Sequence, residues 1–162
     1  MNTTEKVFLA EPYRTELQSR VTEIKEWKSY KGVILDATIF YPEGGGPEGD
    51  RGYIGSYTVY NTIYNDKGEI LHLVDSTSTL EIGSLVETSL DWAHRYHYMR
   101  QHTCQHLISG VLYTSFDIDT HSVHLSDTYI AIETGTSTID QDTLYKIEDE
   151  VNRAILLGGE TS

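Results

Sequence analysis

The chain has 162 residues, of which 38% are hydrophobic, so it can bury a core as one domain or as two small ones. Its 12 lysine and arginine residues stand against 25 aspartate and glutamate residues, and the net charge of −13 repels polyanions unless their contacts are local. No apolar run approaches the roughly 18 residues of a membrane-spanning helix, and Met1–Tyr13 lacks the features of a signal peptide. A single cysteine excludes an intrachain disulfide, so we expect a cytoplasmic protein.

Residues 1–90 have the composition of a small antiparallel β-barrel. Short runs rich in tyrosine, valine, isoleucine and threonine predict strands and hairpins at Val33–Tyr41, Tyr53–Tyr64 and Glu69–Val74. A glycine cluster follows the first run, and residues 65–68 (Asn-Asp-Lys-Gly) predict a turn between the other two. Thr15–Lys28 is compatible with a short helix or a strand, because its apolar positions fit a helical stripe only loosely.

Residues 91–162 change to a helical pattern. Asp91 is a plausible N-cap for a long helix over Trp92–Phe116, which contains no proline. Two short strands and a last helix follow in the prediction, at His121–Leu125, at Tyr129–Thr134, and from Asp140 or Asp142 to about Leu157. The predicted fold class is therefore α+β, with a barrel domain at 1–90 and an α+β domain with a long helix at 91–162.

Each predicted helix has one apolar face. On the long helix the core face comprises Ala93, Tyr96, Cys104, Leu107, Ile108 and Val111. On the last helix it comprises Leu144, Ile147, Val151, Ala154 and Ile155. Cys104 is accordingly interpreted as a small core residue rather than a nucleophile.

Two histidines, His102 and His106, lie four residues apart on the long helix and outside its core face. This spacing brings both imidazoles to the same side of adjacent turns, where they can share a metal ion. The spacing alone is more typical of two surface histidines than of a metal site, and periodicity does not decide between the two interpretations.

Three segments have a combined resemblance to a known family. They are Asp91–Leu107 around the histidine pair, Thr38–Gly46 followed by Asp50-Arg51-Gly52, and Ile147–Asn152. The first resembles the metal-binding helix of the editing domain shared by alanyl-tRNA synthetases, free-standing AlaX proteins and, more distantly, threonyl-tRNA synthetases. The second resembles the glycine-rich motif of the longer AlaX proteins, and the third a helix near the end of the domain.

The resemblance implies an N-terminal β-barrel, an α+β editing domain, and ATP-independent hydrolysis of tRNA(Ala) mischarged with serine or glycine. It implies that zinc is bound by His102 and His106, where the ion can polarise the ester carbonyl, activate a water or bind the substrate's amino group. It assigns no catalytic residue. It also implies contacts to the acceptor end of the tRNA from Thr38, Gly44, Gly45 and Gly46.

The family completes its metal site with a Cys-Gly-Gly-Thr-His-like segment after the last helix, and this sequence ends without one. We therefore expect either a chain truncated before the second ligand pair or a natural relic, with zinc bound weakly or not at all. The deacylase activity is then expected of the complete protein, and this chain alone is expected to be inactive. Other residues are poor substitutes by geometry. Cys104 points about 200° around the helix from either histidine, and His94 lies about 12 Å along it from His102. His121 and His124 point to opposite faces of a strand.

The glycine cluster has two compatible interpretations, a tight turn that requires positive φ values and a contact with the substrate. Pro47 follows the three glycines where the family usually has glutamine. Residues 44–49 also match the dinucleotide-binding pattern G-x-G-x-x-G, but that pattern must open a helix, and the proline and later glycines predict loop and strand instead.

Two functions are compatible with the sequence. The first is a trans-editing hydrolase for mischarged tRNA(Ala). The second is a non-catalytic tRNA- or protein-binding module derived from the editing domain, and the acidic charge slightly favours it. Arg95 and Arg100 are predicted either to contact tRNA phosphates or to pair with neighbouring carboxylates. A truncated domain also predicts exposed apolar surface or a homodimer.

Overall fold

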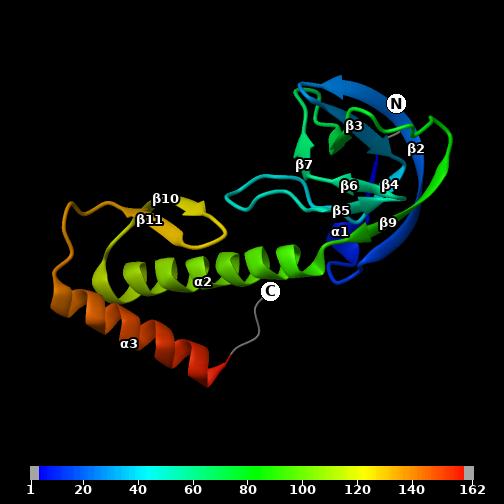
Figure 1. Cartoon of the computed structure of the whole chain (residues 1–162). Coiled ribbons are helices and arrows are strands. Elements are labelled where there is room, and N and C mark those ends of the chain that lie inside the picture. Colours follow the sequence, from blue (N-terminus) through cyan, green and yellow to red (C-terminus); the bar gives the residue numbers. More distant parts are fainter. Residues whose placement is uncertain (1–3, 159–162) are drawn as a thin grey trace. The chain divides into compact units, whose positions relative to one another are not determined.

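A computed structural model describes residues 4–158 of the chain. These residues form two compact units, the first ending at Tyr96 and the second beginning at His97, and each unit has its own hydrophobic core. The first unit is a curved antiparallel sheet, and the second combines helices with a β-hairpin (Figure 1). The predicted α+β class with an N-terminal barrel is therefore confirmed.

Seven strands of the first unit pair antiparallel in a sheet that curls into a nearly closed barrel (Figure 1). In spatial order they are β6 (Tyr57–Val59), β5 (Gly52–Ile54), β9 (Leu85–Leu90), β2 (Glu16–Trp27), β3 (Tyr30–Leu35), β8 (Ile70–Asp75) and β7 (Asn61–Tyr64). A short helix α1 (Val7–Ala10) and a parallel pair, β1 (Glu5–Lys6) with β4 (Ala37–Thr38), complete this unit.

The segment that the sequence left open between helix and strand is the long strand β2. Its first part pairs with β9 and its second part with β3. A bulge between Val21 and Glu23 separates the two parts, and a bulge inserts one extra residue into the strand and bends it. Leu17 and Val21 contact the core before the bulge, whereas Ile24 does so after it, which changes the inward positions from odd to even. This change explains why no single period fits the segment.

The barrel core consists of aliphatic side chains and one phenylalanine, each at most 9% exposed. Its members are Val7, Val21, Val33, Leu35, Ile39, Phe40, Ile54, Val59, Val74 and Leu90. Because they come from every part of residues 7–90, the core depends on contacts between residues far apart in the sequence.

Two predicted strand regions are divided in the structure. Val33–Tyr41 is wrong as one continuous run, because β3 ends at Leu35 and only Ala37 and Thr38 form β4. Tyr53–Tyr64 contains parts of three strands, with a turn at Gly55, whose φ of +58° suits glycine. The predicted turn at residues 65–68 is confirmed. Strand β9 was missed, because its polar residues hide the alternation that predicts strands.

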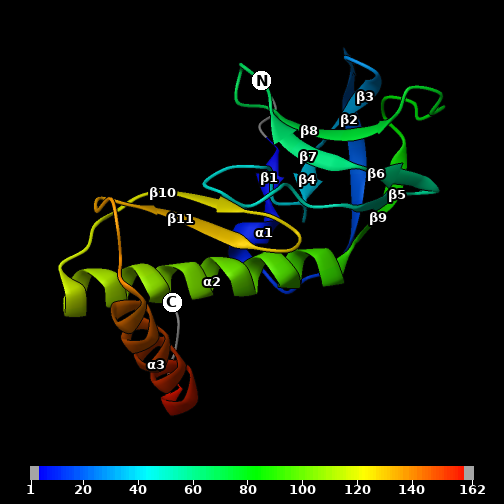
Figure 2. The same cartoon turned by 60° about the vertical axis from the view of Figure 1, so that its left-hand side comes forward.

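The second unit is built around α2 (Trp92–Phe116), which has the predicted bounds and begins within the first unit. The Oδ1 atom of Asp91 accepts the backbone N–H of His94 over 3.1 Å, so Asp91 acts as the predicted N-cap. The predicted strands form a hairpin of β10 (Thr120–Leu125) and β11 (Ile130–Thr134), which lies along α2 in both views (Figure 2).

The last helix, α3 (Gln141–Leu157), starts after Asp140, whose carboxylate accepts the backbone N–H of Thr143 over 2.8 Å. Leu112 of α2 and Ile147 and Val151 of α3 form the buried centre of the second unit.

The predicted helix faces are correct in part. Ile147 and Val151 are buried as expected, but Leu144 and Ile155 are 43% and 56% exposed. On α2, Ala93 is exposed and Tyr96 is 46% exposed, whereas Arg95 and Gln105 are buried. The apolar-face rule fails here because α2 buries polar side chains that have hydrogen-bond partners. None of the helices within residues 4–158 is long and apolar enough to cross a membrane.

Candidate functional site

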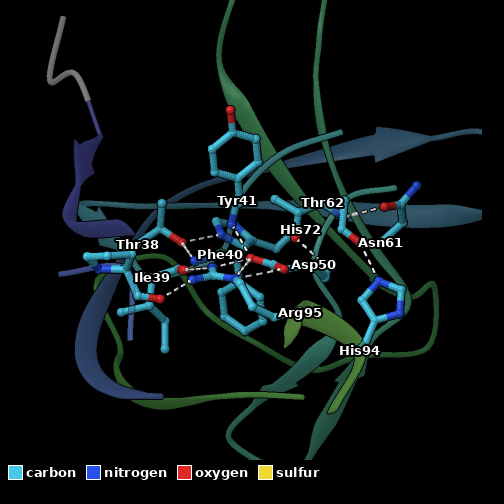
Figure 3. A network of polar contacts seen from close by, with 12 residues as sticks. Thr38, Ile39, Phe40, Tyr41, Asp50, Asn61, Thr62, His72, His94 and Arg95 are labelled. Carbon is cyan, nitrogen blue, oxygen red and sulfur yellow. Dashed lines mark hydrogen bonds and ion pairs between the residues drawn. The ribbon is translucent and has the colours of Figure 1, made fainter. Parts of the chain in front are cut away.

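Thr38 lies at the end of β4 with 0% of its surface exposed. Its Oγ1 lies 2.7 Å from Nε2 of His72 and accepts the backbone N–H of Phe40 over 3.0 Å (Figure 3). Nδ1 of His72 lies 2.8 Å from the Val33 carbonyl oxygen, which can only accept, so Nδ1 carries the proton and Nε2 accepts from the Thr38 hydroxyl. Burial lowers the pKa of His72 to about 4, so the ring is neutral.

The glycine-rich loop, residues 42–49, is closed at its base by hydrogen bonds. The N–H of Asp50 donates to the Tyr41 carbonyl over 2.9 Å, and the N–H of Tyr41 donates to the Asp50 carboxylate. Thr62 of β7 holds both sides, because its Oγ1 donates to the Asp50 carbonyl over 2.9 Å and its own carbonyl accepts from Glu43 over 2.8 Å. The base of the loop is therefore fixed from the barrel wall.

Arg95, in the first turn of α2, binds the same base (Figure 3). Its side chain is 7% exposed and that of Asp50 is 6% exposed, and the guanidinium contacts both carboxylate oxygens. The other N–H groups donate to the Ile39 carbonyl over 2.6 Å and the Pro12 carbonyl over 2.8 Å. Of the two predicted partners for Arg95, a phosphate or a carboxylate, the structure shows the carboxylate.

The tip of the loop is open to solvent. Gly44, Gly45 and Gly46 are exposed, and a Cβ on Gly44 or Gly45 would meet no atom within 4 Å. Gly45 and Gly46 have φ values of +70° and +116°, so the turn interpretation of these glycines is confirmed.

Gly49 has a different requirement from the glycines at the loop tip. A Cβ on it would lie 2.0 Å from the Thr62 carbonyl oxygen. His94 also lies against Gly49, with Nε2 3.0 Å from its carbonyl oxygen. Gly49 is therefore required by close packing rather than by its backbone angles.

The predicted histidine pair lies on α2, in the second unit. The Nε2 atoms of His102 and His106 are 3.0 Å apart, and their ring centroids are 4.6 Å apart. Burial is the larger of two causes that lower the pKa of His102, and the neighbouring His106 is the smaller one. The lowered pKa favours the neutral ring that a metal ion requires. The two rings thus lie side by side on one side of the helix.

No group of three His, Cys, Asp or Glu side chains within residues 4–158 is arranged to hold a metal ion. Cys104 is half-buried, and His124 packs 6.0 Å from the ring of Tyr129, centroid to centroid.

Sequence reasoning missed the partners that organise the loop. Asp50 was part of the quoted motif, but its contact with Arg95 spans 45 residues and no local pattern predicts it. His72 was not considered, because a single histidine in a strand has no distinguishing signal. One signal in the sequence could have indicated that Arg95 is buried. It lies three residues after Trp92, in the first turn of a helix that directly follows the barrel.

The sequence also matches known proteins. The family model described as tRNA synthetases class II (A) matches residues 2–94. The alanyl-tRNA editing protein AlaX-L of Pyrococcus horikoshii is 36% identical over 94% of this chain and 38% of the relative. AlaX-M of the same organism is 38% identical over 69% and 50%, and AlaX-M of Saccharolobus solfataricus is 32% identical over 94% and 64%. The chain thus spans between 38% and 64% of the length of these relatives.

Proposed function

We propose that the chain is part of a hydrolase that deacylates mischarged tRNA(Ala). The basis is its family, because the chain belongs to the tRNA synthetases class II (A) and is an AlaX-type alanyl-tRNA editing protein. The substrate is tRNA(Ala) that carries serine or glycine, bound by its acceptor end. The observation that carries the proposal is the His102–His106 pair, whose Nε2 atoms lie 3.0 Å apart. The reaction is hydrolysis of the ester between the amino acid and the terminal ribose.

The donor set of this pair fits a zinc ion. Two nitrogens that share a tetrahedral zinc at 2.0–2.1 Å lie about 3.3 Å apart, close to the observed separation. His102 and His106 would therefore hold two positions of the metal. A bound zinc supplies Lewis-acid polarisation of the ester carbonyl or a water of lowered pKa. Metal binding requires an unprotonated imidazole nitrogen, and the lowered pKa of His102 favours this form of its ring.

The glycine-rich loop contributes the contacts to the acceptor end in this proposal. Its exposed tip, Gly44, Gly45 and Gly46, offers backbone groups without side chains in the way. Thr38 is buried in the barrel, where its hydroxyl accepts the N–H of Phe40. Its role in this proposal is to fix the backbone that leads into the loop. A direct contact of Thr38 with the aminoacyl group stays a prediction, as does a cytoplasmic location.

The second candidate is the non-catalytic binding module, which the net charge of −13 favours slightly. It predicts binding to tRNA(Ala) or to a protein without release of the amino acid. The two candidates therefore differ in turnover rather than in binding.

The decisive experiment measures hydrolysis of seryl-tRNA(Ala) with added zinc, and the release of labelled serine reports the rate. No group of three metal-binding side chains lies within residues 4–158, so we expect turnover by a longer protein that contains this chain rather than by the chain alone. In that protein His102→Ala should lower the rate at least about 100-fold, since even the outer partners of a metal site contribute 10- to 100-fold. His124→Ala is the matched control, because this exposed histidine lies in the same unit and should leave the rate unchanged. Equal binding of tRNA without serine release in all three proteins would support the binding module instead.

A further inference from the structure

An open groove of about 720 Å³ lies on the barrel unit. Aromatic rings line much of it: Tyr30, Tyr53, Tyr60 and Trp92. Tyr53 and Tyr60 are 51% and 46% exposed, so part of each ring is available to a ligand. The rings of Tyr30 and Tyr60 lie 5.5 Å apart, centroid to centroid, and support each other. An aromatic surface of this kind suits a flat ligand.

The charges in the groove are few and already engaged. Among the lining residues within 4–158, Arg51 alone is cationic, and its guanidinium pairs with Glu48 over 2.5 Å. Asp91 is the one acidic residue among them, and its carboxylate caps α2 by accepting the N–H of His94. A ligand is therefore recognised here through ring faces rather than through strong charge, which suits a chain with a net charge of −13.

The groove begins, along the chain, just after the base of the glycine-rich loop. Arg51 and Gly52 line the groove and directly follow Asp50 at the base of the loop. The N–H of Asp91 donates to the Arg51 carbonyl over 2.8 Å, which fixes this edge of the groove. A single strand that contacts the loop therefore has a neighbouring surface on the same unit.

We propose that this groove, with Tyr53 and Tyr60 as stacking platforms, binds unpaired nucleotides of an RNA strand. Bases stack on aromatic side chains irrespective of their identity, and unpaired RNA is the form whose bases are free to do so. The inference rests on the proposed function, in which these nucleotides belong to the acceptor end of the substrate tRNA.

The test uses the fluorescence of Trp92 in the Trp27→Phe background, where it is the only tryptophan. The probe is a single-stranded RNA hexanucleotide of cytidine and adenosine. We expect saturable quenching, with affinity about 5- to 150-fold weaker in Tyr53→Leu and in Tyr60→Leu. Tyr64→Leu is the matched control, because Tyr64 is 42% exposed on the same barrel but does not line the groove. It should bind like the parent protein.

Salt dependence separates stacking from phosphate binding. Because Arg51 is the one cation in the groove, the slope of log affinity against log salt should not exceed about 0.7 in magnitude. A steeper slope, an unchanged affinity in both tyrosine variants, or no quenching would overturn the inference.

The seryl-tRNA(Ala) assay keeps this inference distinct from the proposed function. Binding of the hexanucleotide without hydrolysis by a longer protein that contains this chain would refute the hydrolase and keep the groove. Hydrolysis that is unaffected by the tyrosine variants, with no binding of the hexanucleotide, would refute the groove and keep the hydrolase.

Discussion

Removing Arg95 tests whether the base of the glycine-rich loop depends on a buried ion pair. Arg95→Met keeps an unbranched apolar stem but leaves the Asp50 carboxylate, which is 6% exposed, with only the Tyr41 N–H of the contacts shown. The Ile39 and Pro12 carbonyls lose their donors as well. Breaking one partner of a buried pair costs about 3–5 kcal/mol, a large share of the roughly 5–15 kcal/mol that stabilises a domain.

Urea unfolding followed by tryptophan fluorescence measures this loss. Trp27 and Trp92 are the two tryptophans of the chain, and both lie in the first unit, so the signal reports on the barrel. Arg51→Met is the matched control. Its partner Glu48 and its own side chain are 43% and 42% exposed, so its loss should cost at most about 1 kcal/mol.

A double-mutant cycle separates the pair from its surroundings. Asp50→Asn removes the charge but keeps an oxygen for the Tyr41 N–H. We expect the double variant, Asp50→Asn with Arg95→Met, to lose less stability than the sum of the single losses, by on the order of 1–3 kcal/mol. Additive losses, or equal losses in Arg95→Met and Arg51→Met, would refute the reasoning.

Three further predictions follow from single residues. His72 binds a proton below about pH 6.5 in the unfolded chain but only below about pH 4 in the folded one, so the free energy of unfolding should rise by about 3 kcal/mol from pH 4 to 6.5. In urea titrations at several pH values, His72→Gln should remove this part of the rise. An unchanged dependence of the unfolding free energy on pH in His72→Gln would contradict the prediction. Gly49→Ala should cost about 1–3 kcal/mol because its Cβ meets the Thr62 carbonyl, whereas Gly44→Ala, with no atom within 4 Å, should be nearly neutral; equal melting curves would disprove the packing argument. Leu156, 87% exposed on α3, should contribute to binding of a hydrophobic dye or to dimerisation in light scattering, and Leu156→Lys should reduce both; a monomer that binds no dye would exclude this surface.

Local patterns predicted the elements that depend on nearby residues. The bounds of α2 and the cap at Asp91 follow from helix signals within a few positions. The turn at residues 65–68 and the hairpin of β10 and β11 also depend on short-range contacts. Such elements are readable because their hydrogen bonds join residues that are close in the sequence.

The parts that sequence reasoning missed depend on distant contacts. The bulge in β2 reverses the inward side of the strand, and only pairing with both β3 and β9 reveals it. The burial of Arg95 is invisible to an apolar-face rule, because its partner Asp50 lies 45 positions away. The proximity of His102 and His106 was predicted because their spacing is local. The residues that fix the base of the loop were not predicted, because they come from distant parts of the sequence.

The central claim is that His102 and His106 hold the zinc of an alanyl-tRNA editing hydrolase. Its most direct test is the rate of seryl-tRNA(Ala) hydrolysis after removal of metal with a chelator and again after addition of zinc. The account predicts that hydrolysis by a longer protein that contains this chain is lost and then restored, and that zinc restores nothing in its His106→Ala variant. Hydrolysis that persists without metal, or equal recovery in His106→Ala, would contradict it.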